Sequence, residues 1–259
     1  MNILDKIVEY KRAEVLGSKQ KRSLSSLNSS PWYRRRCNEI SLSPEAGRPA
    51  IIAEFKRRSP SRGAINLEAD PVLVAGAYES AGVAAMSILT DQPSFGGSLR
   101  DLQAVRESRP DLVLLRKDFI IDPYQIHEAS AFGADMVLLI AAILEPQEVE
   151  ELALEATSLG LRVLFEVHDA YELENHHPAI PYVGVNNRDL KTFQVDTRRS
   201  LELIRLMPPG VVPVSESGLS SPAEIGKLSE AGYRLFLMGE TFMKEKDPGA
   251  ACNLLMEKL

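Results

Sequence analysis

Short apolar runs alternate with segments of helical spacing along most of the chain, from Pro49 onward. This alternation is typical of repeated strand–helix units built around a parallel sheet. The predicted strands begin at Ile51, Ala85, Val113, Met136, Arg162, Tyr182, Val211 and Arg234. Eight such units in a chain of this length favour a single closed (β/α)8 barrel, the TIM barrel, with an open doubly wound sheet as the alternative.

The predicted helices carry their own start and stop signals. Apolar residues between Val149 and Leu159 recur at helical spacing and end at Gly160. Ser221 and Glu224 have the spacing of a capping box, and Asp247 precedes a proline that is suited to a first helical turn. Four glycines come after predicted helices and shortly before strands, where we expect left-handed caps: Gly82, Gly133, Gly160 and Gly232.

The first 48 residues lie outside this alternation and predict an N-terminal helical extension. Its opening segment, MNILDKIVEYKRAEV, mixes charged and apolar residues as an amphipathic helix does. Residues 23–30 are rich in turn formers and belong to an extension that leads to the first strand. No low-complexity linker follows Pro49, so we expect residues 1–259 to form one catalytic domain.

Composition and charge exclude several classes of binding partner. The net charge of -6 and the pI near 5.4 provide no basic field for nucleic acid. The apolar run from Met136 to Leu144 is too short to span a membrane, and the first helix lacks a leader's continuous apolar segment. We therefore expect a cytoplasmic protein without membrane contact, a monomer or at most a weak homodimer. Cys37, Cys252 and four scattered histidines indicate no disulfide framework and no metal site.

The predicted strands end in polar residues, and in a TIM barrel the carboxyl ends of the strands carry the chemistry. Glu54 and Lys56 end the first strand, Lys117 the third and Glu166 the fifth. Two acids and two amines at one face can donate and accept protons and pair with a substrate carboxylate. From sequence order alone, a ring of ion pairs that only stabilises the barrel explains the same polar strand ends equally well.

Two neighbouring loops predict a phosphate site. Ser217 and Gly218 follow the seventh strand, and Gly239 and Glu240 follow the eighth. Backbone N–H groups of both loops would point at one anion, as phosphate sites of barrels require. The segments 57–68 and 92–98 are predicted to be loops able to act as lids.

Taken together, several blocks resemble the indole-3-glycerol phosphate synthase family over nearly the whole chain. The blocks stand in the family's order and are IIAEFKRRSPSRG, SILTDQPSFGGS, LLRKDFIIDPYQI, FEVHD, VGVNNRDL, VSESGL and FLMGETFM. The resemblance implies a TIM barrel with an extra N-terminal helix. It also implies ring closure, decarboxylation and dehydration of 1-(2-carboxyphenylamino)-1-deoxyribulose 5-phosphate, in tryptophan biosynthesis, with no cofactor or metal.

The resemblance assigns catalytic roles position by position. Lys117 looks like the general acid that protonates the ketone oxygen, and Glu166 like the base that assists dehydration. Glu54 would assist proton transfer, and Lys56 would pair with the substrate carboxylate until it leaves. Asn186 and Ser217 would donate or accept hydrogen bonds at the hydroxyls and the ring side.

The resemblance also assigns binding roles. Arg188 would order the neighbouring carboxylates, and the substrate ring would lie among Ser59, Pro60, Phe95, Phe119 and Leu237. Gly218, Gly239 and Glu240 would hold the phosphate through backbone amides.

Two alternatives belong to different functional classes. A phosphoribosylanthranilate isomerase needs a Cys and Asp acid–base pair, but neither Cys37 nor Cys252 lies at a predicted strand end. A sugar phosphate sensor would need only the phosphate loops, and it would not need matched acids and amines. An assay for indole formation separates the three.

Overall fold

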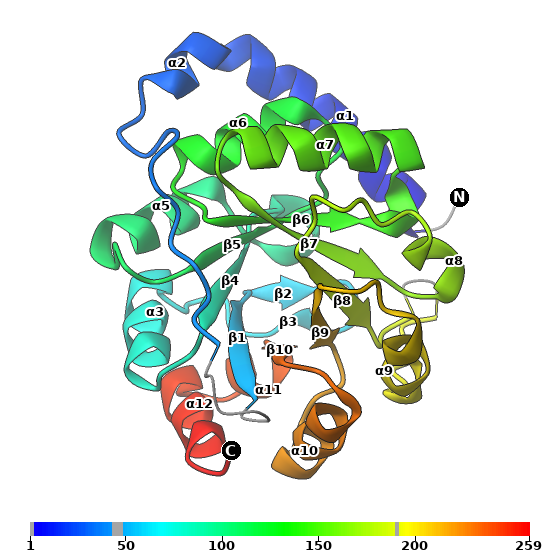
Figure 1. Cartoon of the computed structure of the whole chain (residues 1–259). Coiled ribbons are helices and arrows are strands. Elements are labelled where there is room, and N and C mark those ends of the chain that lie inside the picture. The colour runs from blue at the N-terminus through cyan, green and yellow to red at the C-terminus, as the bar shows by residue number, and fades with distance from the viewer. Residues whose placement is uncertain (1–2, 43–48, 190–191) are drawn as a thin grey trace.

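The chain folds into a closed parallel barrel surrounded by helices, as the computed structural model in Figure 1 shows. The structure describes residues 3–42, 49–189 and 192–259. Neighbouring strands follow the order β1, β10, β9, β8, β7, β6, β5, β4, and β4 returns to β1. The TIM barrel prediction is confirmed, and the open doubly wound sheet is excluded.

The eight barrel strands begin within one residue of the predicted positions. They are β1 (Ala50–Phe55), β4 (Ala85–Leu89), β5 (Leu114–Lys117), β6 (Met136–Ile140), β7 (Arg162–Val167), β8 (Tyr182–Asn186), β9 (Val212–Glu216) and β10 (Leu235–Met238). The barrel closes through the pairing of β1 with β10, in which Ala50 stands opposite Leu235. The first and the last strand of the sequence are therefore neighbours.

The helices connect these strands and cover the outside of the barrel (Figure 1). Those before β7 are α1 (Ile3–Lys21), α2 (Leu24–Asn28), α3 (Pro71–Ser80), α4 (Gln92–Phe95), α5 (Leu99–Ser108), α6 (Pro123–Ala131), η1 (Ala141–Ile143) and α7 (Pro146–Ser158). Those after it are α8 (Ala170–Leu173), α9 (Arg198–Leu203), η2 (Ile204–Leu206), α10 (Pro222–Ala231), α11 (Glu240–Met243) and α12 (Pro248–Met256). Among the residues described, no helix is both long and apolar enough to cross a membrane.

Local sequence explains the ends of several helices. Ser221 and Glu224 form the predicted capping box at the start of α10, and the Asp247 side chain caps α12. Gly82, Gly133, Gly160 and Gly232 all have positive φ, between 79° and 121°, which a side chain would disfavour. The glycine caps predicted from the sequence are confirmed.

Short helices and strands form in three segments that the sequence marks only as turn-rich or as loops. Residues 24–28 form helix α2, because the Ser23 side chain caps it by accepting a hydrogen bond from the Ser26 N–H. Asp91 caps the four-residue helix α4 in the same way. Within the other predicted loop, β2 (Arg58–Ser59) and β3 (Gly63–Ala64) pair as an antiparallel hairpin.

The N-terminal extension passes over the outside of the barrel before it enters β1. Figure 1 shows α1 and α2 beside α6 and α7, and residues 29–42 running down from α2 along the outside of the barrel. The extension prediction covers residues 1–48, of which residues 1–2 and 43–48 lie outside the described part.

A buried aspartate ties this segment to the barrel. The Asp135 carboxylate accepts hydrogen bonds from the side chains of Arg35 and Arg106. It also accepts from the backbone N–H of Asn38 at 2.7 Å and of Leu114 at 2.8 Å. Asp135 is fully buried, so its charge depends on these donors.

Strand alternation divides the core into two layers. Ile51, Ala53 and Phe55 of β1 pack between the barrel and its helices, whereas Ile52 packs inside the barrel. The interior layer also contains Leu115, Leu138, Leu164, Val214, Leu235 and Leu237. Residues two positions beyond an interior side chain point into the barrel as well, towards its carboxyl end.

Candidate active site

The barrel's interior alternation brings the predicted acids and amines to one mouth. Glu54 stands two residues after Ile52, Lys117 two after Leu115, and Glu166 two after Leu164. The β period of two therefore directs all three side chains inward at the carboxyl end of their strands.

A cavity of about 640 Å³ opens at this mouth. Its lining includes every predicted site residue: Glu54, Lys56, Ser59, Pro60, Phe95, Lys117, Phe119, Glu166, Asn186, Arg188, Ser217, Gly218, Leu237, Gly239 and Glu240. This volume is in the range of pockets that bind small molecules. The structure thus brings the predicted residues together, while their roles remain predictions.

Lys117 is held between two carboxylates. Its Nζ lies 2.9 Å from Glu216 Oε2 and 3.3 Å from Glu166 Oε2. Burial opposes the ammonium charge, but the facing carboxylates of Glu216, Glu166 and Glu54 outweigh it and raise the pKa of Lys117 above its ordinary value. The Lys117 side chain is therefore a positively charged ammonium group at the mouth of the barrel at neutral pH.

Glu216 received no role from the sequence interpretation, although it ends β9. Burial is the main cause that raises its pKa to about 7; Lys117 opposes the rise and Glu166 adds to it. Its Oε1 has no hydrogen-bond partner among the residues that the structure describes. A Cβ on Gly184 would lie 2.2 Å from this oxygen, so only glycine leaves room for the carboxyl group. Its position two residues after interior Val214 is the signal that could have identified it.

Glu166 has a second set of partners besides Lys117. Asn186 Nδ2 donates to its Oε1 at 3.1 Å, and His168 Nε2 lies 3.6 Å from the same oxygen. Burial raises the pKa of Glu166, but Lys117, His168 and the Asn186 hydrogen bond together lower it below the ordinary value. Glu166 is therefore an ionised carboxylate at neutral pH, able to accept a proton.

Glu54 pairs with Lys56 on the opposite side of the mouth. Lys56 Nζ lies 2.6 Å from Glu54 Oε1. A Cβ on Gly239 would come within 2.4 Å of that same oxygen. The close approach of the Gly239 backbone to Glu54 links the end of β1 to the loop that follows β10.

The two predicted phosphate loops lie next to each other at this mouth. Ser217 and Gly218 both have positive φ, 67° and 75°, a conformation that turns the chain sharply after β9. Thr241 Oγ1 donates to the Leu219 carbonyl at 2.7 Å and joins the two loops.

The Glu240 side chain is paired with cations. It lies 2.7 Å from Arg62 and 3.3 Å from Arg188, so its charge is partly neutralised beside the loops. Arg188 also donates its backbone N–H to Asn186 Oδ1. From the sequence, Arg188 is predicted to order neighbouring carboxylates. Among the residues described, the carboxylate that Arg188 contacts is Glu240.

An apolar wall closes the other side of the cavity. The rings of Phe95 and Phe119 lie 6.2 Å apart between centroids, and Leu237 belongs to the same cluster. Ile3, Leu4 and Ile7 of α1 line the cavity too. The sequence interpretation assigned these three no role, because nothing in an amphipathic helix alone reveals which element its apolar face meets.

No group of three or more His, Cys, Asp or Glu side chains suited to a metal ion occurs within residues 3–42, 49–189 and 192–259. Cys252 is buried in α12, and burial raises the pKa of its thiol. Cys37 lies in the segment before β1, beside Asp135 and away from the cavity lining. Neither thiol reaches the mouth, which argues against a Cys and Asp acid–base pair.

Comparison with known proteins gives one family over nearly the full length. A family profile described as "Indole-3-glycerol phosphate synthase" matches residues 4–255. A protein named indole-3-glycerol phosphate synthase from Bacteroides thetaiotaomicron is 46% identical over 254 residues, which cover 96% of this chain and 95% of the relative. One of the same name from Azoarcus sp. is 42% identical and covers 98% of both chains.

Solved structures with low sequence identity share the fold. A structure described as "Native KDPGal structure" has a TM-score of 0.61 at 14% identity and covers 85% of this chain and 94% of its own. A chain of the tryptophan synthase a2b2 complex from Pyrococcus furiosus has a TM-score of 0.60 at 12% identity. The match covers 81% of this chain and 97% of the chain in that complex. These similarities support the barrel and carry no information on the reaction.

Proposed function

Because this chain belongs to the indole-3-glycerol phosphate synthase family, we propose that its cavity closes the indole ring of 1-(2-carboxyphenylamino)-1-deoxyribulose 5-phosphate. The products are indole-3-glycerol phosphate, carbon dioxide and water, and the enzyme is a carbon–carbon lyase of tryptophan biosynthesis. The observation that carries the assignment is Lys117, a partly buried ammonium between Glu166 and Glu216 in a cavity with an apolar wall on one side and the predicted phosphate loops on the other.

Ring closure needs a proton at the substrate ketone. Lys117 donates it to the ketone oxygen while the ring carbon that bears the carboxylate attacks the carbonyl carbon. The new carbon–carbon bond forms and the ketone becomes a hydroxyl group. The carboxylates beside Lys117 keep it charged until the ketone oxygen begins to gain negative charge, which is when a proton donor is most effective.

Decarboxylation restores the aromatic ring. Lys56 pairs with the substrate carboxylate during binding and ring closure, and the carbon–carbon bond to that carboxylate then breaks to release carbon dioxide. The bonding electrons return to the ring. In the structure Lys56 is paired with Glu54 at 2.6 Å, so we infer that the substrate carboxylate competes with Glu54 for this ammonium.

Dehydration completes the indole. Glu166 takes a proton from the carbon next to the anilino nitrogen and supports positive charge on that nitrogen. The hydroxyl group leaves as water after it receives a proton, with Glu54 assisting the transfer. The lowered pKa of Glu166 supports its role as an ionised base.

The remaining residues bind and orient the substrate. Asn186 and Ser217 hydrogen bond its hydroxyls, and Arg188 orders the carboxylates beside it. Ser59 and Pro60 line the carboxyphenyl side, where Phe95, Phe119 and Leu237 enclose the ring. Gly218, Gly239 and Glu240 hold the phosphate by backbone amides, which the positive φ of Gly218 supports.

An assay with the carboxyphenylamino substrate tests the proposal. Indole fluorescence should grow with time and with enzyme concentration. Phosphoribosylanthranilate should be left unchanged, because neither cysteine reaches the cavity. Tight binding of the substrate without indole formation would favour a sensor and overturn the enzyme proposal.

We also propose that the whole chain acts as one catalytic domain, as a monomer in the cytoplasm. The support is that residues from the first helix to the last loop of a single chain line one cavity. Sedimentation velocity measures the mass in solution. A mass of two chains at micromolar concentration would contradict the monomer.

A further inference from the structure

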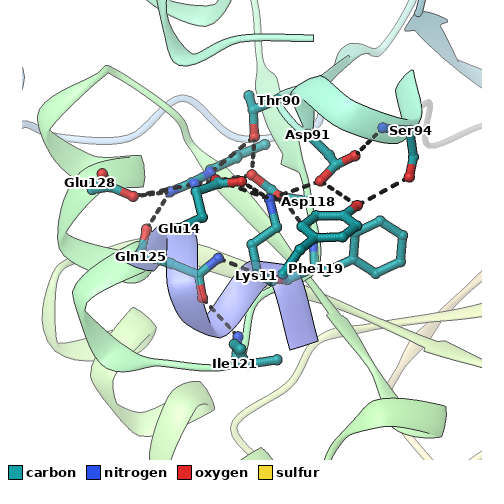
Figure 2. A network of polar contacts seen from close by, with 12 residues as sticks. Lys11, Glu14, Thr90, Asp91, Ser94, Asp118, Phe119, Ile121, Gln125 and Glu128 are labelled. Carbon is teal, nitrogen blue, oxygen red and sulfur yellow. Dashed lines mark hydrogen bonds and ion pairs between the residues drawn. The ribbon is translucent and has the colours of Figure 1, made fainter. Parts of the chain in front are cut away.

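Lys11 is a lysine that the proposed reaction does not use, yet it is completely buried in α1. Its Nζ lies 2.9 Å from Asp91 Oδ1, 2.9 Å from Asp118 Oδ1 and 3.0 Å from Glu14 Oε1, as Figure 2 shows. All three ammonium protons therefore have carboxylate acceptors. A charge at this depth persists only with such partners.

One of the two aspartates, Asp118, lines the active-site cavity. Asp118 stands between Lys117 and Phe119, and its Oδ1 also accepts the Phe119 N–H at 2.8 Å. Its Oδ2 accepts from Arg116 of β5. A movement of Asp118 would therefore shift the backbone that carries both the acid and an aromatic residue of the cavity.

Asp91 connects the same lysine to a second aromatic residue. Its Oδ2 accepts the Ser94 N–H at 2.9 Å and so caps α4, which ends at Phe95. Its Oδ1 accepts a hydrogen bond from the hydroxyl of Tyr10, the neighbour of Lys11 on α1. Lys11 thus joins α1 to the segments that follow β4 and β5.

The part of α1 before Lys11 forms one wall of the cavity. Ile3, Leu4 and Ile7 line it, and Leu4 and Ile7 belong to the cluster that contains Phe119 and is in contact with Phe95. The predicted phosphate loops follow β9 and β10, and the carboxylates that pair with Lys11 belong to α1 and to the segments after β4 and β5 instead. The ion pairs of Lys11 therefore connect α1 to the aromatic side of the cavity.

We propose that Lys11 is a positioning residue for the aryl ring of the substrate: its ion pairs with Asp91 and Asp118 hold α1 against Phe95 and Phe119, and so complete the ring pocket. The inference rests on the proposed function, because it assigns the carboxyphenyl ring to this side of the cavity. It adds α1 and its buried lysine to the residues that determine how the ring is bound.

Steady-state kinetics of Lys11→Met give the first test. The methionine keeps most of the apolar stem and removes the charge, so α1 loses its ion pairs with both aspartates but retains the Tyr10 hydrogen bond to Asp91. We expect KM for the carboxyphenylamino substrate to rise about tenfold or more, the scale of imperfect packing around an apolar group. The inhibition constant of inorganic phosphate should stay within about twofold of wild type, since the loops are unaffected.

Lys6→Met is the matched control, because Lys6 lies on the same helix and is exposed. It should leave KM unchanged. An unchanged KM in Lys11→Met, or an equal loss of phosphate affinity, overturns the inference, whereas wild-type protein that forms no indole product overturns the proposed function instead.

A second measurement needs no variant and remains available if Lys11→Met does not fold. Hydrogen exchange of wild-type α1 amides is followed with anthranilate or with inorganic phosphate. Anthranilate should slow exchange across residues 3–14 and phosphate should not. Equal exchange in both ligands would contradict the inference.

Discussion

Lys117 Nζ lies closer to Glu216 Oε2, at 2.9 Å, than to Glu166 Oε2, at 3.3 Å. The proposed acid is therefore held most closely by a carboxyl group with a pKa of about 7, and the proposed base stands slightly apart. We therefore expect Glu216 to hold the ammonium in place while Glu166 accepts a proton from the substrate.

Removing either member of the proposed acid–base pair should abolish most of the turnover. We expect Lys117→Ala and Glu166→Gln each to lower kcat by at least about a hundredfold, because general acid or base assistance contributes on that scale. Indole fluorescence measures the rate. Lys227→Ala, on the exposed side of α10, serves as the control and should retain full activity. Near-normal indole production by either site variant would refute these roles.

Glu216→Gln should change how stability depends on pH. The pKa of Glu216 is higher in the folded protein than in the unfolded chain, so protonation of this carboxyl group favours folding. Its contribution is complete below the ordinary carboxyl pKa and is lost as pH rises through about 7.

Glu216→Gln cannot ionise at this position, so its stability should not decrease in this way as pH rises. Between pH 4.5 and 8.5, wild type should lose about 2 to 4 kcal/mol of unfolding free energy relative to Glu216→Gln, since one unit of pKa difference corresponds to about 1.4 kcal/mol. Urea unfolding at both pH values measures it. Glu230→Gln, at an exposed glutamate, should follow wild type. Parallel pH curves for wild type and Glu216→Gln would contradict the prediction.

Gly239→Ala should impair catalysis through Glu54. The added Cβ would lie 2.4 Å from Glu54 Oε1, so the carboxylate or the loop after β10 must move. We expect kcat to fall about tenfold or more, as expected when a catalytic group is displaced by a fraction of an ångström. Gly226→Ala is the control, because nothing lies within 4 Å of its Cβ position and the residue is inside α10. If both alanine variants keep wild-type kcat, Glu54 is not constrained by Gly239.

Asp135→Ala should destabilise the fold without altering substrate affinity. The substitution leaves Arg106, a fully buried cation, without its carboxylate, and breaking a buried pair in this way costs about 3 to 5 kcal/mol. Chemical denaturation measures the loss, and KM at low temperature should match wild type. Asp111→Ala, at an exposed aspartate just before β5, should lose little stability. A raised KM would show that the N-terminal segment affects the cavity through this contact.

The sequence predicted the barrel and the residues at its mouth because both follow from local spacing. Side chains alternate between the two faces of a strand. Glu54 therefore points inward like Ile52, and Glu166 like Leu164, whichever residues the neighbouring strands contain. Strand starts were found within one residue because turn formers and helix caps border each apolar run.

The features that the sequence did not predict include contacts between segments far apart in the chain. Lys11 looks like one charge among several on an amphipathic helix, and its burial depends on Asp91 and Asp118, far away in the sequence. It does occupy the same face as Ile7 and Val15, and that position is the signal that could have revealed it. Helix α4 was missed because four residues carry too little periodicity to separate them from a loop.

The pairing of β1 with β10 has a consequence for synthesis on the ribosome. The first strand leaves the exit tunnel long before its neighbour Leu235 has been translated, so one edge of β1 has no partner during most of elongation. Glu54 meets Gly239 only when that last strand arrives. The nascent chain therefore gains the contact between Glu54 and Gly239 only after β10 has been translated, and until then the open edge of β1 can pair with other chains and promote aggregation.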